Sequence, residues 1–268
     1  MKQTYDTPGQ VTVVLKLGTG DISVRAADTA KTSIEITGYD KATPPRVSCE
    51  PAPDGGHRVT IEHRTKRSWG FSFGRALEIE LVVPAGTRVD GSSGSAELEI
   101  RGTIGSLDFR TGAGDVSFDE VTGDVQIACA SGDIEGRSVG GHMAFKGASG
   151  DIEVGSVGAG ALVRSASGDI QIGRLEGPTT ITVGSGDIDL RQVGAGSVNV
   201  RAIAGDVHIG VREGMGVWLD ISSTSGDVHS GLDAPARGER VDDVPQLELT
   251  VVTVSGDIDV SRVAATRR

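Results

Sequence analysis

The chain has 268 residues, of which 40 are glycine and only 3% are aromatic, and its formal net charge is −11. So few aromatic side chains disfavour an ordinary globular core, and so many glycines favour short strands joined by tight turns. The acidic balance excludes extensive binding to nucleic acid, because phosphate contacts need a basic face. No cofactor-binding motif is present, and no cofactor is predicted.

Residues 1–90 are predicted to form a β region without a regular repeat. Alternating apolar residues predict strands at 11–17, 21–25, 32–37, 58–63 and 77–83. The triplet Gly20-Asp21-Ile22 resembles the repeat that follows it, so we expect wider, degenerate coils and a cap here. No leader and no run of about 18 apolar residues is visible. The sequence therefore predicts a cytoplasmic protein without a transmembrane segment, with a peripheral position at the cell envelope as an option.

An aromatic and basic segment interrupts this region at residues 64–75. Trp69, Phe71 and Phe73 alternate, so an extended strand would place all three on one face. Arg67 and Arg75 flank them, and aromatic side chains rimmed by arginine are typical of protein interfaces and membrane-surface anchors. We predict contact with a protein partner or a second copy here, with a glycan or a membrane surface as further options. An apolar plug over the open N-terminal end of the solenoid is an equally simple interpretation of the same residues.

The dipeptide Gly-Asp followed by Ile or Val dominates residues 91–268. It recurs every 18 residues from Gly114 to Gly186 and then, after longer steps, at Gly205, Gly226 and Gly256. Such a period indicates a repeat architecture, and alternating apolar residues on both sides of each Gly indicate two strands per unit. The sequence predicts an all-β, single-stranded parallel β-solenoid, right-handed, with coils stacked in chain order and an excursion at 233–245. Propeller blades are disfavoured because they need about 40 residues.

Each Gly is expected at positive φ, and the Asp after it is expected to bond to nearby backbone. These aspartates form one predicted turn ladder: Asp115, Asp133, Asp151, Asp169, Asp187, Asp206, Asp227 and Asp257. Stacked carboxylates repel, so hydrogen bonds, water or bound cations must offset the repulsion. Structural turn caps are favoured, and calcium is the alternative.

A second polar ladder lies three residues after each Gly. Chain-order stacking makes His208 and His229 direct neighbours, flanked by Asp189 and Asp259. Two histidines with carboxylates are a possible zinc site, whereas a solvated polar ladder is the simpler interpretation.

Clustered carboxylates also occur in polysaccharide-cleaving β-helix enzymes. Here the acidic residues repeat along the chain, whereas an active site usually occurs only once in a protein. The prediction is therefore a non-catalytic scaffold that presents an acidic surface to a partner, and a carbohydrate-active hydrolase or lyase is the alternative. Two further residues are predicted to be buried, Trp218 in the core and Cys129 as a small filler.

The Ser-Gly-Asp-Ile ladder, residues 17–22 and the segment 218–232 resemble a bacterial β-strand-repeat family of unknown function. Its members are labelled candidate adhesins or toastrack domains, and this chain is similar to the actinobacterial type over nearly its whole length. The resemblance implies a β-helical scaffold without established catalytic residues, and a link to envelope stress.

Overall fold

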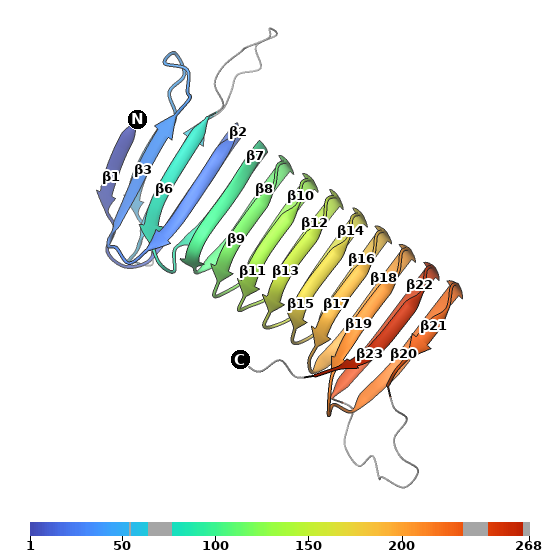
Figure 1. Ribbon diagram of the computed structural model, residues 1–268. Helices are drawn as coiled ribbons and strands as arrows, with labels where there is room; N and C mark the ends of the chain where they lie inside the picture. Colours follow the sequence, from blue (N-terminus) through green and yellow to red (C-terminus); the bar gives the residue numbers. More distant parts are fainter. Residues whose placement is uncertain (54, 64–76, 233–245, 265–268) are drawn as a thin grey trace. The chain divides into compact units, whose positions relative to one another are not determined.

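A computed structural model describes residues 1–53, 55–63, 77–232 and 246–264. All regular structure in these residues is β-strand (Figure 1), which confirms the predicted fold class. The chain divides into two compact units, Met1–Val139 and Gly140–Arg268. The division predicted at residues 90 and 91 falls inside the strand Arg88–Ile104 of the first unit and stays a prediction.

The later part of the first unit is a stack of parallel coils. Its strands are β7 (Arg88–Ile104), β8 (Ser106–Ala113), β9 (Val116–Val121), β10 (Val125–Ser131) and β11 (Ile134–Val139). β8 pairs in parallel with β7 and β10, and β9 pairs in parallel with β7 and β11. Val125 lies opposite Leu107, so residues one repeat apart occupy equivalent places.

The N-terminal part of this unit mixes parallel and antiparallel pairing. Its strands are β1 (Lys2–Asp6), β2 (Val11–Ala27), β3 (Lys31–Thr37), β4 (Arg46–Pro51), β5 (His57–His63) and β6 (Glu78–Pro84). β2 merges two predicted strands and pairs in parallel with β7 along one edge and with β5 and β6 along the other. β4 pairs antiparallel with β5, and β3 lies between β6 and β1 and pairs antiparallel with both. The sequence analysis missed β1 and β4, which have no fully buried residue and hence no strong apolar alternation.

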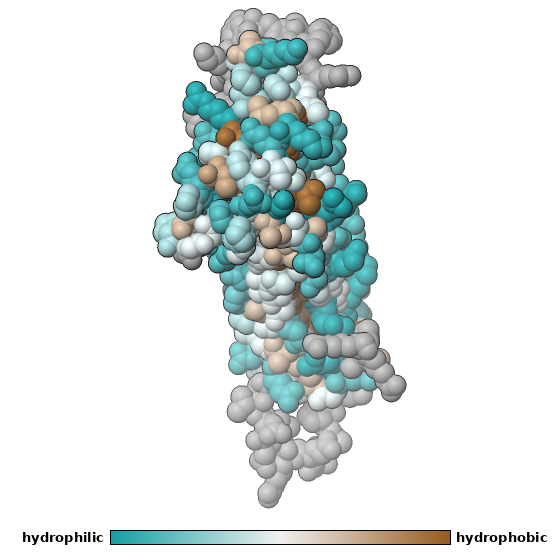
Figure 2. All heavy atoms as spheres, turned by 90° about the vertical axis from the view of Figure 1, so that its left-hand side faces the viewer, coloured by the Kyte–Doolittle hydropathy of each residue, from teal (hydrophilic) through white to brown (hydrophobic). Residues whose placement is uncertain are grey.

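The β1 side of the first unit is largely hydrophilic (Figure 2). Lys2 forms an ion pair with Glu35 at 3.0 Å, and Lys31 lies 3.5 Å from Asp6. Charged side chains on edge strands discourage pairing with other chains. This side of the unit is therefore protected against strand addition.

The second unit is built from parallel coils of two strands each. The strands are β12 (Met143–Ser149), β13 (Ile152–Val157), β14 (Ala161–Ser167), β15 (Ile170–Leu175), β16 (Thr179–Ser185), β17 (Ile188–Val193), β18 (Gly196–Ala204), β19 (Val207–Arg212), β20 (Val217–Ser225), β21 (Val228–Ser230), β22 (Leu247–Ser255) and β23 (Ile258–Val263). The strands from β12 to β19 stack in chain order, even-numbered on even-numbered and odd-numbered on odd-numbered. The predicted parallel solenoid is confirmed, and its right hand stays a prediction.

The predicted chain-order stacking is wrong at the C-terminal end of this unit. β22 pairs with β18 on one side and with β20 on the other, and β23 lies in the same way between β19 and β21 (Figure 1). In this internal position Leu249 and Val251 of the inserted coil are completely buried.

The interior of each unit is filled by stacked columns of inward-facing apolar residues. Phe109 and Ile127 of the first unit, for example, are 0% and 1% exposed. One of these columns is interrupted by Gly136, and side-chain packing explains the interruption. A Cβ at Gly136 would collide with the ring of Phe118 from the preceding coil. A glycine here leaves the space that the larger neighbour fills.

Candidate interaction surfaces

The Gly-Asp corners are held by hydrogen bonds that run from coil to coil. All the repeat glycines have positive φ, as predicted, for example Gly132 at 143° and Gly205 at 131°. In each observed contact the backbone N–H of one ladder aspartate donates to Oδ1 of the aspartate in the adjacent coil. In the first unit Asp133 donates to Asp115 at 2.9 Å. In the second unit the contacts, donor first, are Asp169 to Asp151, Asp187 to Asp169, Asp206 to Asp187 and Asp257 to Asp206, each at 2.8 Å, and Asp227 to Asp257 at 2.7 Å.

This arrangement gives each accepting carboxylate of the corner ladder a structural role. A hydrogen bond from a backbone N–H to a carboxylate is charge-assisted, and it offsets part of the repulsion between stacked acids. No group of three or more His, Cys, Asp or Glu side chains lies in metal-binding geometry within the described part of the chain. The contacts therefore support turn capping as the role of these residues.

The second polar ladder is brought together, but in a different order from the predicted one. Asp189 lies opposite His208, His208 opposite Asp259, and Asp259 opposite His229. The two histidines are thus separated by Asp259, because the last coil is inserted between their coils. Asp189 accepts hydrogen bonds from Arg191 and Gln171, each at 3.3 Å. No metal role is assigned to these four residues.

The predicted contact segment with Arg67, Trp69, Phe71, Phe73 and Arg75 lies outside the described residues. Trp218 is described, and the prediction that it belongs to the core is wrong. Its side chain is 52% exposed. Adjacent strand residues face opposite sides, so Leu219 on the inner face sets Trp218 on the outer one.

The sequence analysis missed an exposed group of aliphatic residues on β18 and β22. Ile203, Val254 and Val252 are 63%, 50% and 39% exposed, and we call them the aliphatic patch. Arg201 lies opposite Val252, and the same register sets Ile203 beside Val254. The signal was present in the sequence. Two residues before the repeat Gly, the five regular units carry only Gly or Ala, namely Gly112, Ala130, Ala148, Ala166 and Gly184.

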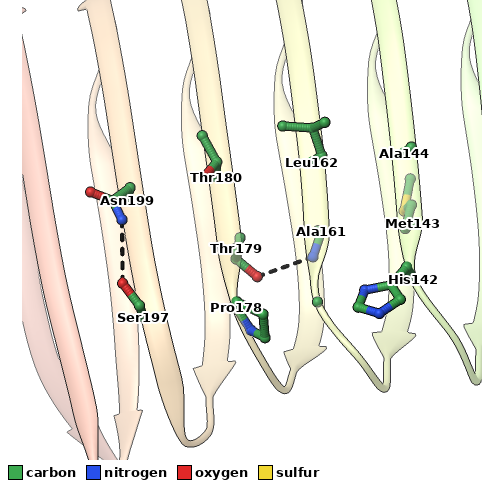
Figure 3. Close-up of a pocket in the computed structure, with 11 residues that line it drawn as sticks. His142, Met143, Ala144, Ala161, Leu162, Pro178, Thr179, Thr180, Ser197 and Asn199 are labelled. Atoms are coloured by element: carbon green, nitrogen blue, oxygen red, sulfur yellow. Dashed lines mark hydrogen bonds between the residues drawn. The ribbon is translucent and has the colours of Figure 1, made fainter.

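A hollow of about 420 Å³ lies on the same outer sheet face, over β12, β14, β16 and β18 (Figure 3). His142 and Pro178 lie at the turn end of the hollow, and Leu162 stands between Ala144 and Thr180. None of the residues that line this hollow carries a carboxylate, an ammonium or a guanidinium. Glycoside cleavage uses a pair of carboxyl groups, so the hollow lacks the groups for that reaction.

The two cysteines are free thiols. Burial is the main cause that raises the pKa of the Cys129 thiol, and the carboxylates of Asp115 and Asp133 raise it further. A raised pKa keeps the thiol protonated, and a protonated thiol is a poor nucleophile. The buried position agrees with the predicted role of Cys129 as a space-filler.

Equivalent parallel coils joined by one repeated, hydrogen-bonded corner define a β-solenoid scaffold. The chain belongs to the Toastrack DUF4097 family, whose sequence model matches residues 12–261. This confirms the resemblance found in the sequence. No curated protein matches the chain, and no helix among the described residues has the length and apolar character needed to cross a membrane.

The solved structures that are similar to the chain include the following three. A candidate cell adhesion protein of Clostridium sporogenes shares 10% identity with a TM-score of 0.31, covering 98% of this chain and 99% of that one. A candidate adhesin of Bacteroides fragilis shares 13% identity with a TM-score of 0.41, covering 98% and 96%. A candidate adhesin of Parabacteroides distasonis shares 12% identity with a TM-score of 0.43, covering 97% and 96%.

Proposed function

We propose that this protein is a non-catalytic β-solenoid scaffold that binds a protein partner through its outer sheet face. The observation that carries the proposal is the aliphatic patch of Ile203, Val252 and Val254, which groups exposed apolar side chains on the adjacent strands β18 and β22. Exposed apolar side chains grouped in this way are typical of protein-binding surfaces. The periodic distribution of the acidic residues also favours a scaffold over an enzyme.

The experiment compares two variants in capture of partners from the cells that make the protein. Ile203→Asp combined with Val254→Asp places charges in the patch, and Leu162→Asp is the matched control, since Leu162 is an exposed aliphatic residue on the same face but outside the patch. A partner that binds through the patch is lost with the double variant and retained with the control.

The captured protein is then purified, and its affinity for each variant is measured. We expect the double variant to raise the dissociation constant about tenfold or more, as is usual for residues at the centre of an interface. An unchanged affinity, or a loss with Leu162→Asp alone, would exclude the patch as the binding site. The second outcome would point to the hollow.

The segment with Trp69, Phe71 and Phe73 is a second proposed contact, and it rests on the amino-acid sequence alone. Its three aromatic residues and flanking arginines fit a protein interface. A membrane-surface contact would place the protein at the cell envelope and is tested separately below.

A further inference from the structure

Among the described residues, the backbone groups along one edge of β20 have no partner strand. β20 pairs with β22 along one edge, and within the described ranges no strand pairs with its other edge. The N–H of Leu247 donates to the C=O of Gly216 at 3.2 Å, so the even-numbered residues at this end of the strand direct their backbone groups toward β22. The N–H and C=O groups of Val217, Leu219 and Ile221 consequently point to the unpaired edge.

The apolar interior is also incompletely covered at this edge. Leu219 and Ile221 are only half-buried, and Val228 of β21 is 44% exposed. Their counterparts in the inserted coil, Leu249 and Val251, are completely buried. The same coil therefore leaves both hydrogen-bonding groups and apolar surface available to a further strand.

β20 lacks the features that protect edge strands. The edge strands of the first unit carry several charges, among them Lys2, Arg46 and Glu50. In β20 the only charged residue is Asp220, and there is no Pro or Lys. An edge strand without such features readily pairs with another strand.

We propose that β20 pairs antiparallel with β20 of a second copy of this chain, about a twofold axis at Ile221. Ile221 is the central residue of this nine-residue strand, so the register gives complete overlap. Asp220 then faces the partner's Ser222, and Leu219 faces the partner's Ser223. A shift of the axis to Asp220 would place it opposite the partner's Asp220, and like charges in that position are destabilising.

A second copy suits this edge better than an unrelated strand. A twofold axis makes the interface isologous, so one surface provides both halves. In the Ile221 register the odd-numbered residues of both strands face one another, and their unpaired N–H and C=O groups can exchange hydrogen bonds. The half-buried Ile221 side chains also meet on the inner face. This inference does not depend on the protein partner proposed above.

The test uses a pair of charge variants at Ser222, which faces outward and is exposed. Ser222→Asp sets an acid opposite the partner's Asp220 on both sides of the axis, whereas Ser222→Lys sets a base there. Sedimentation velocity of the full chain over a range of concentrations gives the dimer dissociation constant. We expect a dimer whose dissociation constant rises about tenfold with Ser222→Asp and falls or stays unchanged with Ser222→Lys.

A second readout follows Trp218, which lies three residues from Ile221 and faces Thr224 of the second copy in the proposed register. In a Trp69→Phe background Trp218 is the single tryptophan, and its emission should shift to shorter wavelength as the dimer forms. Thermal unfolding of both Ser222 variants controls for folding. A monomer at all concentrations would overturn the proposal, as would a dimer that responds equally to Asp and Lys. A monomer that still binds the partner protein would leave the function proposed for the aliphatic patch intact.

Discussion

The backbone N–H of Asp257 donates to Oδ1 of Asp206 at 2.8 Å, although the two residues are 51 positions apart. In the regular coils the same bond joins aspartates that are 18 positions apart, as between Asp187 and Asp169. The contact continues the corner ladder at the position where β22 and β23 are inserted between two coils that precede them in the sequence. It therefore links the inserted coil to its neighbour by the same interaction that joins the regular ones.

We expect Asp206→Ala to lower the free energy of unfolding by about 1 kcal/mol, because the Asp257 N–H loses its charged acceptor. Asp206→Asn should lose less, since it keeps a side-chain oxygen at the position of Oδ1. Urea unfolding measures both changes. Glu248→Ala is the control, as Glu248 is an outward-facing residue of β22 outside the ladder. A loss with Asp206→Ala no larger than that of the control would mean that the ladder bond contributes little.

The packing of Phe118 over Gly136 gives a prediction about volume. Gly136→Ala should destabilise the protein by about 1–3 kcal/mol, because the added methyl group overlaps the Phe118 ring. Phe118→Leu in the same chain should recover part of this loss, so the double variant is more stable than the sum of the single changes predicts. Gly231→Ala is a suitable control, since a Cβ there meets only an ordinary contact at 3.6 Å. Additive effects would contradict the proposed overlap.

The aromatic segment is tested by replacing Trp69, Phe71 and Phe73 together with Ser. If the segment is a contact site, the variant loses association with a protein partner, or with anionic lipid vesicles, and its melting temperature is unchanged. Far-UV circular dichroism and co-sedimentation provide the two measurements. A large drop in the melting temperature would instead identify the segment as a cap over the apolar interior.

The raised pKa of Cys129 predicts a loss of stability at alkaline pH. The thiol ionises more easily in the unfolded chain, where its pKa is near the ordinary 9.0, than in the folded protein. The contribution of the protonated Cys129 thiol to the free energy of unfolding is therefore complete below about pH 9, and it is lost as the pH rises through the folded-state pKa. The free energy of unfolding should fall more steeply above about pH 9 in the parent chain than in Cys129→Ala. Equal slopes would show that this thiol is not protected by burial.

The sequence predicts the regular coils well because each repeat carries the complete set of local signals. The glycine at positive φ, the aspartate after it and the alternating apolar residues all agree, as at Gly132, Asp133 and Ile134. Because local conformational preference and packing pattern agree, the structure of such a segment can be predicted from its own residues alone. Gly20 lies in the N-terminal part, which has no regular repeat, but it is also followed by Asp and Ile and also has positive φ.

The order of the last coils and the exposed aliphatic patch do not follow from these local signals. β20 and β22 have similar alternation, and what distinguishes them is the burial available on two sides rather than one. Trp218 was misplaced for a related reason. It lies beside the inward-facing columns in the sequence, but the register of the strand is set by Leu219 and Ile221, and a shift of one residue reverses every side chain.

The inserted position of β22 and β23 also constrains how the protein can be made. On a ribosome β20 and β21 emerge before the coil against which they pack. Until residues 246–263 have been synthesised, these strands have no partner in the final arrangement, and the coil of β18 and β19 presents an open edge. Completion of this end is therefore delayed relative to the regular coils, each of which can add to a neighbour already formed. During that interval the nascent chain exposes apolar strand edges, which makes it a candidate for chaperone protection.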